Sequence, residues 1–113
     1  DGKFDSSTNY RFTPGVAGYY QINATVQANA TDATFVINSI MKNGSENFDA
    51  AFDLRDGGSA GDSPSATQSR VLYLDTDDYV ELFATVTSGS TCQVAGHDNY
   101  GGFNTHMSGF KIA

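Results

Sequence analysis

The stretch from Tyr10 to Val26 most constrains how this chain can fold. Two short runs of alternating apolar and polar residues are joined there through Pro14, Gly15 and Gly18. Proline cannot donate a backbone hydrogen bond, and glycine adopts backbone angles that other residues avoid. The segment therefore predicts a strand, a sharp corner and a second strand. Past the corner, the even positions 20–26 are apolar and the odd positions are polar, which indicates an antiparallel strand with one face in water.

The rest of the chain continues as short β-prone runs separated by turn residues, and no stretch has a clean helical period. Asn43-Gly44 predicts a tight hairpin, and the polar segment 55–67 predicts an exposed loop. We expect strands at residues 10–13, 19–28, 34–42, 47–54, 68–74, 79–87, 91–95 and 103–112, a turn at 29–32 and a second loop at 96–102. This order predicts one all-β antiparallel domain over residues 1–113, a sandwich or jelly roll with residues 1–9 as a lead-in segment.

Charge narrows the classes of partner. Thirteen acidic residues against six basic ones give a formal charge of −7. An acidic surface repels phosphate groups, so we expect neither a nucleic-acid partner nor a membrane-surface role. The longest apolar run, Phe35–Met41, is too short to span a bilayer, so membrane insertion is not expected. The alternative reading of the charge is that it only keeps the domain soluble.

The cysteine content bears on how the domain is stabilised. The single cysteine, Cys92, cannot form a disulfide within the chain, and its apolar-leaning strand predicts a buried, inert thiol. A small domain without disulfides must draw stability from another source, and oligomerisation is the natural one. The sequence starts at Asp1 without methionine or a secretion signal, so we expect the folded end of a longer polypeptide.

Two of the expected strands are apolar on both faces. In the strand from Thr34, Phe35 and Ile37 lie on one face and Val36 and Ile40 on the other. The strand from Tyr79 has the same pattern. Since only one face of a sandwich strand meets the core, the outer face must be covered as well. Either another copy of the chain covers it in a closed symmetric assembly, or a long loop does.

Several motifs together resemble the complement C1q and tumour-necrosis-factor-like family. They are Phe12-x5-Gly18-x-Tyr20, Lys42-Asn43-Gly44, the segments 71–75 (VLYLD) and 78–82 (DYVEL), and the terminal segment 108–112 (SGFKI). The segment 13–20 (TPGVAGYY) is similar to C1q-like modules at the ends of bacteriophage tail fibres. The resemblance covers residues from about Tyr10 to the end, and it implies a ten-stranded jelly roll that trimerises about an axis. It also implies that the first strand of the ten is lost or lies upstream of Asp1.

The resemblance also suggests which side chains have which role. Those expected in the trimer interface are Phe35, Val36, Ile40, Tyr79, Phe83, Phe103 and Met107. Those expected in the core are Tyr20, Ile22, Val80, Leu82, Phe110 and Ile112.

No arrangement of nucleophile, base and acid is visible, and we do not expect an enzyme. His97 and His106 lack the neighbours that a zinc site needs. We expect no cofactor, although the acidic turn with Asp75, Asp77 and Asp78 has the carboxylates that Ca²⁺ prefers. It lacks the glycine and distal glutamate of the helix-loop-helix calcium motif, so ordinary turn chemistry is the alternative.

Loops offer groups suited to sugar hydroxyls, since planar acids and amides can hydrogen-bond and tyrosine can stack. The residues concerned are Asp56, Asp62, Asn99 and Tyr100. We therefore expect a homotrimeric adhesion domain at the tip of a viral fibre, on the outside of the virion, that binds a host-surface glycan or protein. The alternatives are a purely structural trimerisation or capping domain and a secreted C1q-like recognition protein.

Overall fold

The computed structural model describes residues 3–5, 7–8, 10–29, 34–53, 65–87, 93–94 and 105–113 of the chain. Every secondary-structure element in these ranges is a β-strand, and the strands pair antiparallel in two sheets. The strands are β1 (Lys3–Asp5), β2 (Arg11–Thr13), β3 (Gly18–Asn29), β4 (Phe35–Lys42), β5 (Glu46–Asp53), β6 (Ser65–Leu74), β7 (Val80–Thr87), β8 (Gln93–Val94) and β9 (His106–Lys111). Within these ranges we find no helix suited to crossing a membrane.

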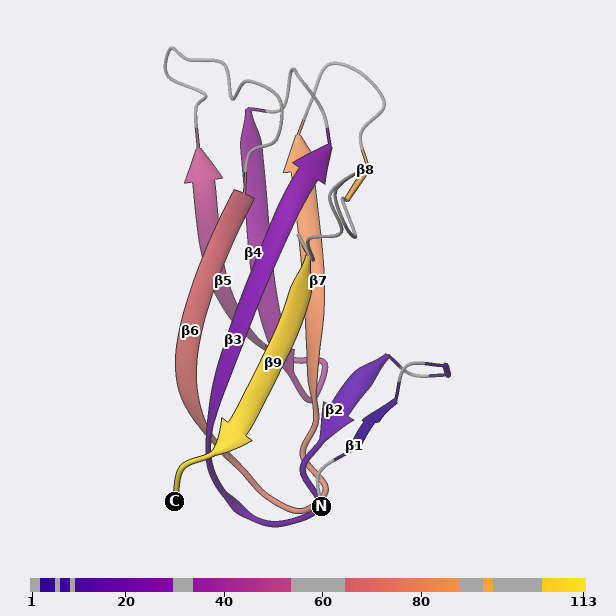
Figure 1. The fold of residues 1–113 in the computed structure, drawn as a ribbon, viewed down its shortest axis with the longest axis vertical. Coiled ribbons are helices and arrows are strands. Elements are labelled where there is room, and N and C mark those ends of the chain that lie inside the picture. The colour runs from indigo at the N-terminus through magenta and orange to yellow at the C-terminus, as the bar shows by residue number, and fades with distance from the viewer. Residues whose placement is uncertain are drawn as a thin grey trace, which may run out of the picture.

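The two sheets face each other, with β6, β3 and β9 in front of β5, β4 and β7 in Figure 1. The first sheet has the order β1-β2-β7-β4-β5. The second has β6 and β9 on either side of β3, and β8 pairs with the far end of β3. The prediction of an all-β chain with antiparallel sheets is confirmed, and the arrangement is compatible with a β-sandwich.

Three of the strand pairs are nested along the chain. β4 pairs with β5 through the hairpin, β3 pairs with β6, and β2 pairs with β7. The chain therefore runs as one long antiparallel ribbon whose successive parts lie in alternate sheets. The β2–β7 pair meets at a single register point, Phe12 opposite Val80, and the short ribbon of β1 and β2 projects from the body in Figure 1.

The alternation seen in the sequence places the core. The even-numbered side chains of β3 are buried and meet buried side chains from β4, β6 and β7. One cluster contains Tyr20, Ile22, Ala24, Ile40, Leu74 and Val80. A second cluster contains Val26, Ala28, Val36 and Ala66. The predicted core residues Tyr20, Ile22 and Val80 are confirmed, and Leu82 packs partly buried against both clusters.

Phe110 and Ile112 were expected in the core, and that prediction is wrong. Phe110 is 53% exposed and Ile112 is 47% exposed. The register explains this, because Phe110 lies opposite Gln21 of β3, and Gln21 points away from the core. Paired residues of an antiparallel ladder point to the same side, so Phe110 also points outward.

Two element boundaries also differ from the sequence expectation. Lys3–Asp5 lies in the segment expected to be a lead-in, yet it forms β1 and pairs with β2, with Phe4 opposite Phe12. The loop expected to run to Thr67 ends earlier, because β6 already begins at Ser65. Only three residues form β1, which is too short for an alternating pattern to be recognised.

A polar network crosses the core between the sheets. The side chain of Asn38 is fully buried, and its Nδ2 donates to the carbonyl oxygens of Ala24 (2.8 Å) and Ala66 (3.1 Å). The Nε2 of Gln68 donates to Asn38 Oδ1 (3.1 Å) and to the carbonyl oxygen of Phe48 (2.9 Å). These bonds join β4 and β5 of one sheet to β3 and β6 of the other, so they fix how the sheets face each other.

Candidate self-association surface

The side of β6, β3 and β9 that points away from the core carries, among the described residues, polar and apolar side chains without a carboxylate, lysine or arginine. We call it the β3 outer face. It consists of Tyr19, Gln21, Asn23, Thr25 and Gln27 on β3, Ser65, Thr67, Ser69, Val71 and Tyr73 on β6, and His106, Ser108 and Phe110 with the following Ile112 on the last strand. None of these residues is Asp, Glu, Lys or Arg, although the chain has 13 acidic residues and a charge of −7.

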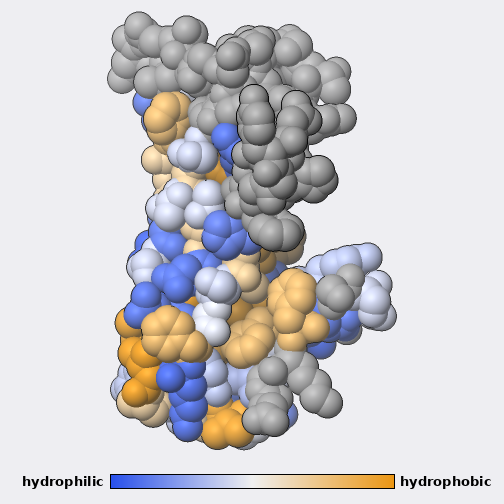
Figure 2. All heavy atoms as spheres, in the orientation of Figure 1, coloured by the Kyte–Doolittle hydropathy of each residue, from blue (hydrophilic) through white to orange (hydrophobic). Residues whose placement is uncertain are grey.

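One end of this face is apolar. Tyr19, Val71, Tyr73, Phe110 and Ile112 are each about half exposed, from 47% for Ile112 to 55% for Val71. We call these five residues the apolar end. In Figure 2 hydrophobic residues gather over the lower part of this face, below a band of hydrophilic ones. Contiguous exposed apolar patches on soluble proteins commonly mark interaction sites.

The strand register brings the apolar end together. Tyr19 lies opposite Tyr73, and their rings meet edge to face with centroids 5.3 Å apart. Val71 and Phe110 flank Gln21 from its two sides. The amide nitrogen of Ile112 donates to the carbonyl oxygen of Tyr19 at 2.8 Å, which holds the last residues of the chain beside the patch.

Five polar side chains in the middle of the face are already hydrogen-bonded to one another within the chain. Gln21 Nε2 donates to Asn23 Oδ1 and to Ser69 Oγ, both at 3.2 Å, and Ser69 Oγ donates to Asn23 Oδ1 at 2.7 Å. The hydroxyls of Thr25 and Thr67 lie 3.2 Å apart. Because these groups satisfy one another, a partner surface could cover them with a smaller desolvation cost than unpaired groups would require.

The outer face of the other sheet differs in charge. It presents Phe35 and Ile37 from β4 and the 49% exposed Phe83 from β7. It also presents carboxylates, since Asp49 and Glu81 lie on the same side as Phe83. Asp49 Oδ1 accepts a hydrogen bond from Ser39 Oγ at 2.6 Å. Apolar side chains on both sides of β4 and β7 are therefore observed, but acidic groups surround those on the outer side.

The predicted trimer-interface residues lie in different parts of the chain. Phe35 and Phe83 lie on the outer face of the five-stranded sheet, and Tyr79 lies partly buried beneath Arg11, whose Cζ is 4.2 Å from the ring centroid. Val36 and Ile40 are completely buried within the chain, so they pack in its own core. Met107 points inward, and Phe103 lies outside the described residues.

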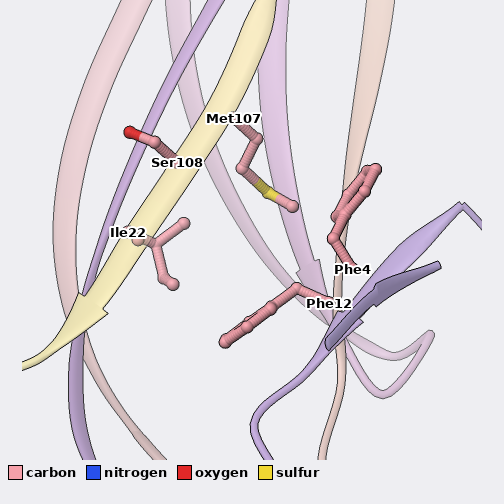
Figure 3. Close-up of a pocket in the computed structure, with 6 residues that line it drawn as sticks. Phe4, Phe12, Ile22, Met107 and Ser108 are labelled. Carbon is pink, nitrogen blue, oxygen red and sulfur yellow. The ribbon is translucent and has the colours of Figure 1, made fainter. Parts of the chain in front are cut away.

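A cavity of about 300 Å³ opens between β9 and the ribbon of β1 and β2. Phe4, Phe12, Ile22 and Met107 point into it, whereas Ser108 points away (Figure 3). Gly109 completes the lining, and a Cβ at this glycine would come within 2.7 Å of Ile22 Cδ1 and 3.1 Å of the Gln21 carbonyl oxygen. Among the described residues the lining therefore offers apolar contact and no charged side chain.

In the acidic turn between β6 and β7, the carboxylate of Asp78 already has partners within the chain. Asp78 Oδ1 accepts from Asn43 Nδ2 and Oδ2 accepts from the Asp75 amide, both at 2.8 Å. Lys42 Nζ lies 3.3 Å from Asp78 Oδ2. The bond from the Asp75 amide, then the bond from Asn43, and then Lys42 lower the pKa of Asp78. Asp77 is exposed beside it, and no group of three potential metal ligands is found in the described part of the chain.

The residues expected to bind a ligand, Asp56, Asp62, Asn99 and Tyr100, lie outside the described residues, as do Cys92 and His97. Sequence reasoning missed the apolar end. The signal was present, since Val71 and Tyr73 alternate with Leu72 and Leu74 and make a third strand that is apolar on both faces.

Comparison of the sequence with models of known protein families finds no match, and neither does comparison with curated proteins.

Proposed function

We propose that this chain is a self-assembling attachment module: a C1q-like jelly roll that forms a homotrimer through the β3 outer face. The observation that carries the proposal is the composition of that face. In a chain with a charge of −7, it has an apolar end and no carboxylate. Copies that repel one another elsewhere can approach there without placing like charges in contact.

The strand pairing supports a jelly roll. A jelly roll is a long antiparallel ribbon rolled up so that its successive parts alternate between two sheets. The nested pairs of β4 with β5, β3 with β6 and β2 with β7 follow this plan. In a jelly roll of this family, the next nested pair lies outside β2 and β7. It would consist of β9 and the first of the family's ten strands.

The proposed contact lies on the sheet of β6, β3 and β9, whereas most of the side chains expected in the interface come from β4, β7 and the residue before β7. Val36 and Ile40 are unavailable because the chain buries them, and Phe83 has carboxylates as neighbours. By contrast, Tyr19, Tyr73 and Phe110 combine exposure with aromatic surface, the type of side chain enriched in protein interfaces. In a trimer, each copy would bury this patch against the other copies. The apolar surface buried in this way would supply the stability that a small domain without disulfides needs.

The attachment role rests on the family resemblance of the sequence. The sequence resembles C1q-like modules that end the tail fibres of bacteriophages and form trimers. We propose that this module likewise sits on a virion and binds a host-surface glycan or protein through the loops that contain Asp56, Asp62, Asn99 and Tyr100.

Binding to surfaces tests the attachment role. The labelled chain would be applied to glycan arrays and to intact cells of a panel of bacterial strains, beside a Tyr100→Ala variant and an Asn47→Ala control in the β5 strand. We expect binding to a subset of strains, reduced at least tenfold by the Tyr100 change and unaffected by the control. A trimer that binds neither glycans nor cells would instead favour the structural capping role.

A further inference from the structure

We infer that Asn43 is a site of spontaneous deamidation, and that its conversion releases a clamp between the two turns at one end of the molecule. Asn43-Gly44 is the only Asn-Gly pair in the sequence. Glycine after asparagine favours this reaction, since a residue without a side chain leaves the backbone nitrogen most accessible. Both residues are exposed, so water reaches them.

The turn that contains Asn43 joins β4 to β5. The amide of Ser45 donates to the Lys42 carbonyl oxygen at 3.1 Å, and the central residues have positive φ, 53° for Asn43 and 69° for Gly44. These angles suit the tight hairpin that Asn-Gly favours. Glycine adopts them without strain, and asparagine tolerates them better than most residues.

The clamp consists of Lys42, Asn43 and Asp78. Asn43 Nδ2 donates to Asp78 Oδ1 at 2.8 Å, and Asn43 Oδ1 accepts from the Tyr79 amide at 3.0 Å. The Asn43 amide donates to the Tyr79 carbonyl oxygen at 3.0 Å. Lys42 Nζ lies 3.3 Å from Asp78 Oδ2 and donates to the Tyr73 carbonyl oxygen at 3.0 Å. One side chain, Asn43, thus joins the β4–β5 turn to the β6–β7 turn through both ends of its amide.

Deamidation proceeds within the turn itself. The Gly44 backbone nitrogen, after losing its proton, attacks the Asn43 side-chain carbonyl carbon and forms a cyclic imide. The bond to Nδ2 breaks, and this nitrogen leaves as ammonia after taking up a proton. Water then opens the ring at either carbonyl, which gives aspartate or isoaspartate at position 43. The net change is the exchange of an NH₂ group for OH, with water as the only co-reactant.

Either product opens the clamp. An aspartate at position 43 replaces the donor that faces Asp78 Oδ1 with a second carboxylate at hydrogen-bond distance, so attraction becomes repulsion. An isoaspartate lengthens the backbone by one methylene group and makes the former side-chain carbonyl the main-chain link to Gly44, so this group is drawn away from Asp78 and the Tyr79 amide. Both changes uncouple the β4–β5 turn from the β6–β7 turn.

The intact clamp also controls how fast the reaction occurs. The imide forms only when the side-chain carbon rotates toward the Gly44 nitrogen, which requires Asn43 to leave Asp78 and Tyr79. A hydrogen bond to a charged group makes this opening about tenfold or more rarer than in a free turn. Asp78 therefore protects Asn43, and its removal should speed deamidation by about the same factor.

Peptide-mapping mass spectrometry tests this inference on the full chain. Wild type, Asp78→Ala and Asp77→Ala would be incubated folded at mildly alkaline pH, and wild type also in urea, with circular dichroism to confirm folding. Asp77 is a matched control because it is the exposed neighbouring carboxylate in the same turn. We expect conversion at Asn43 before any other asparagine, slowest in folded wild type and in Asp77→Ala. We expect it to be about tenfold faster in folded Asp78→Ala and in urea.

Two results would overturn the inference. One is equal rates in folded wild type, folded Asp78→Ala and urea, since the clamp would then give no protection. The other is earlier conversion at a different asparagine. An Asn43→Asp variant tests the consequence separately: its melting temperature should fall below that of wild type. An unchanged melting temperature would show that deamidation does not release the clamp.

Discussion

At the scale of single residues, Asn38 shows how a buried amide can fix the packing of two sheets. We predict that Asn38→Ala lowers the free energy of unfolding by about 1–3 kcal/mol, because the buried carbonyl oxygens of Ala24 and Ala66 lose the donor Asn38 Nδ2 and Gln68 Nε2 loses one of its acceptors. Urea denaturation followed by circular dichroism measures this. As control, Asn47→Ala removes an exposed amide with one long bond to Asp49 and should change stability by less than about 0.5 kcal/mol. Equal losses in both variants would contradict the role of the network.

Asp78 gives a prediction about pH. Its pKa in the folded chain is lowered by hydrogen bonds from the Asp75 amide and Asn43, and by Lys42. A carboxyl group with a lowered pKa stabilises the fold above its unfolded pKa of about 3.9, and this contribution disappears as pH falls through the folded pKa. Asp78→Asn should therefore lower stability more at pH 7 than at pH 3, measured by urea denaturation at each pH. An equal deficit at both pH values would contradict this account.

At the scale of strands, β3 must begin with a glycine, Gly18, because the last residues of the chain pass close to it. The Tyr19 amide donates to the Ala113 carbonyl oxygen at 2.8 Å. A Cβ on Gly18 would collide with that same oxygen and with Cε of Lys111. We predict that Gly18→Ala costs about 1–3 kcal/mol of stability and speeds hydrogen exchange at the Tyr19 amide. The exposed Val16→Ala is the control, and similar exchange in both variants would count against this contact.

The positions of the strands could be predicted from the sequence better than the side of each strand that meets the core. Alternation in residues 20–26 placed β3 and its buried side correctly. In β9, by contrast, Met107 and Phe110 lie on opposite sides, so the sequence alone does not tell which side meets the core. The pairing of Phe110 with Gln21 decides it, and that register depends on tertiary structure. The inward-pointing Asn38 was also unforeseen, because a lone amide between Val36 and Ile40 carries no local signal of its distant partners.

At the scale of the whole molecule, the sequence predicts self-association, and most of the side chains it suggests for the interface lie outside the surface proposed here. Strands with two apolar faces suggested a covered outer sheet. The choice between the sheets depends on which side chains share a face, since carboxylates from β5 and β7 join Phe83 whereas only neutral residues join Phe110. That distribution arises from strands distant in the sequence.

Matched variants on the two faces separate these surfaces. Phe110→Ser and Phe83→Ser each remove a half-exposed phenylalanine, one from each sheet. We predict that Phe110→Ser weakens assembly by about tenfold or more, because it removes an apolar anchor from the contact, while Phe83→Ser leaves assembly unchanged. Sedimentation over a concentration series measures both. The reverse outcome would place the contact on the five-stranded sheet.

The most direct test of the central proposal is the mass of the intact chain in solution, measured by light scattering at micromolar concentration. One chain has a mass of 12.0 kDa. We predict three times that mass, independent of a chelator, because the residues of the proposed contact include an apolar end and no carboxylate. A mass of one chain across the whole concentration range would contradict the proposal, and the β3 outer face would then be an exposed surface without a self-partner.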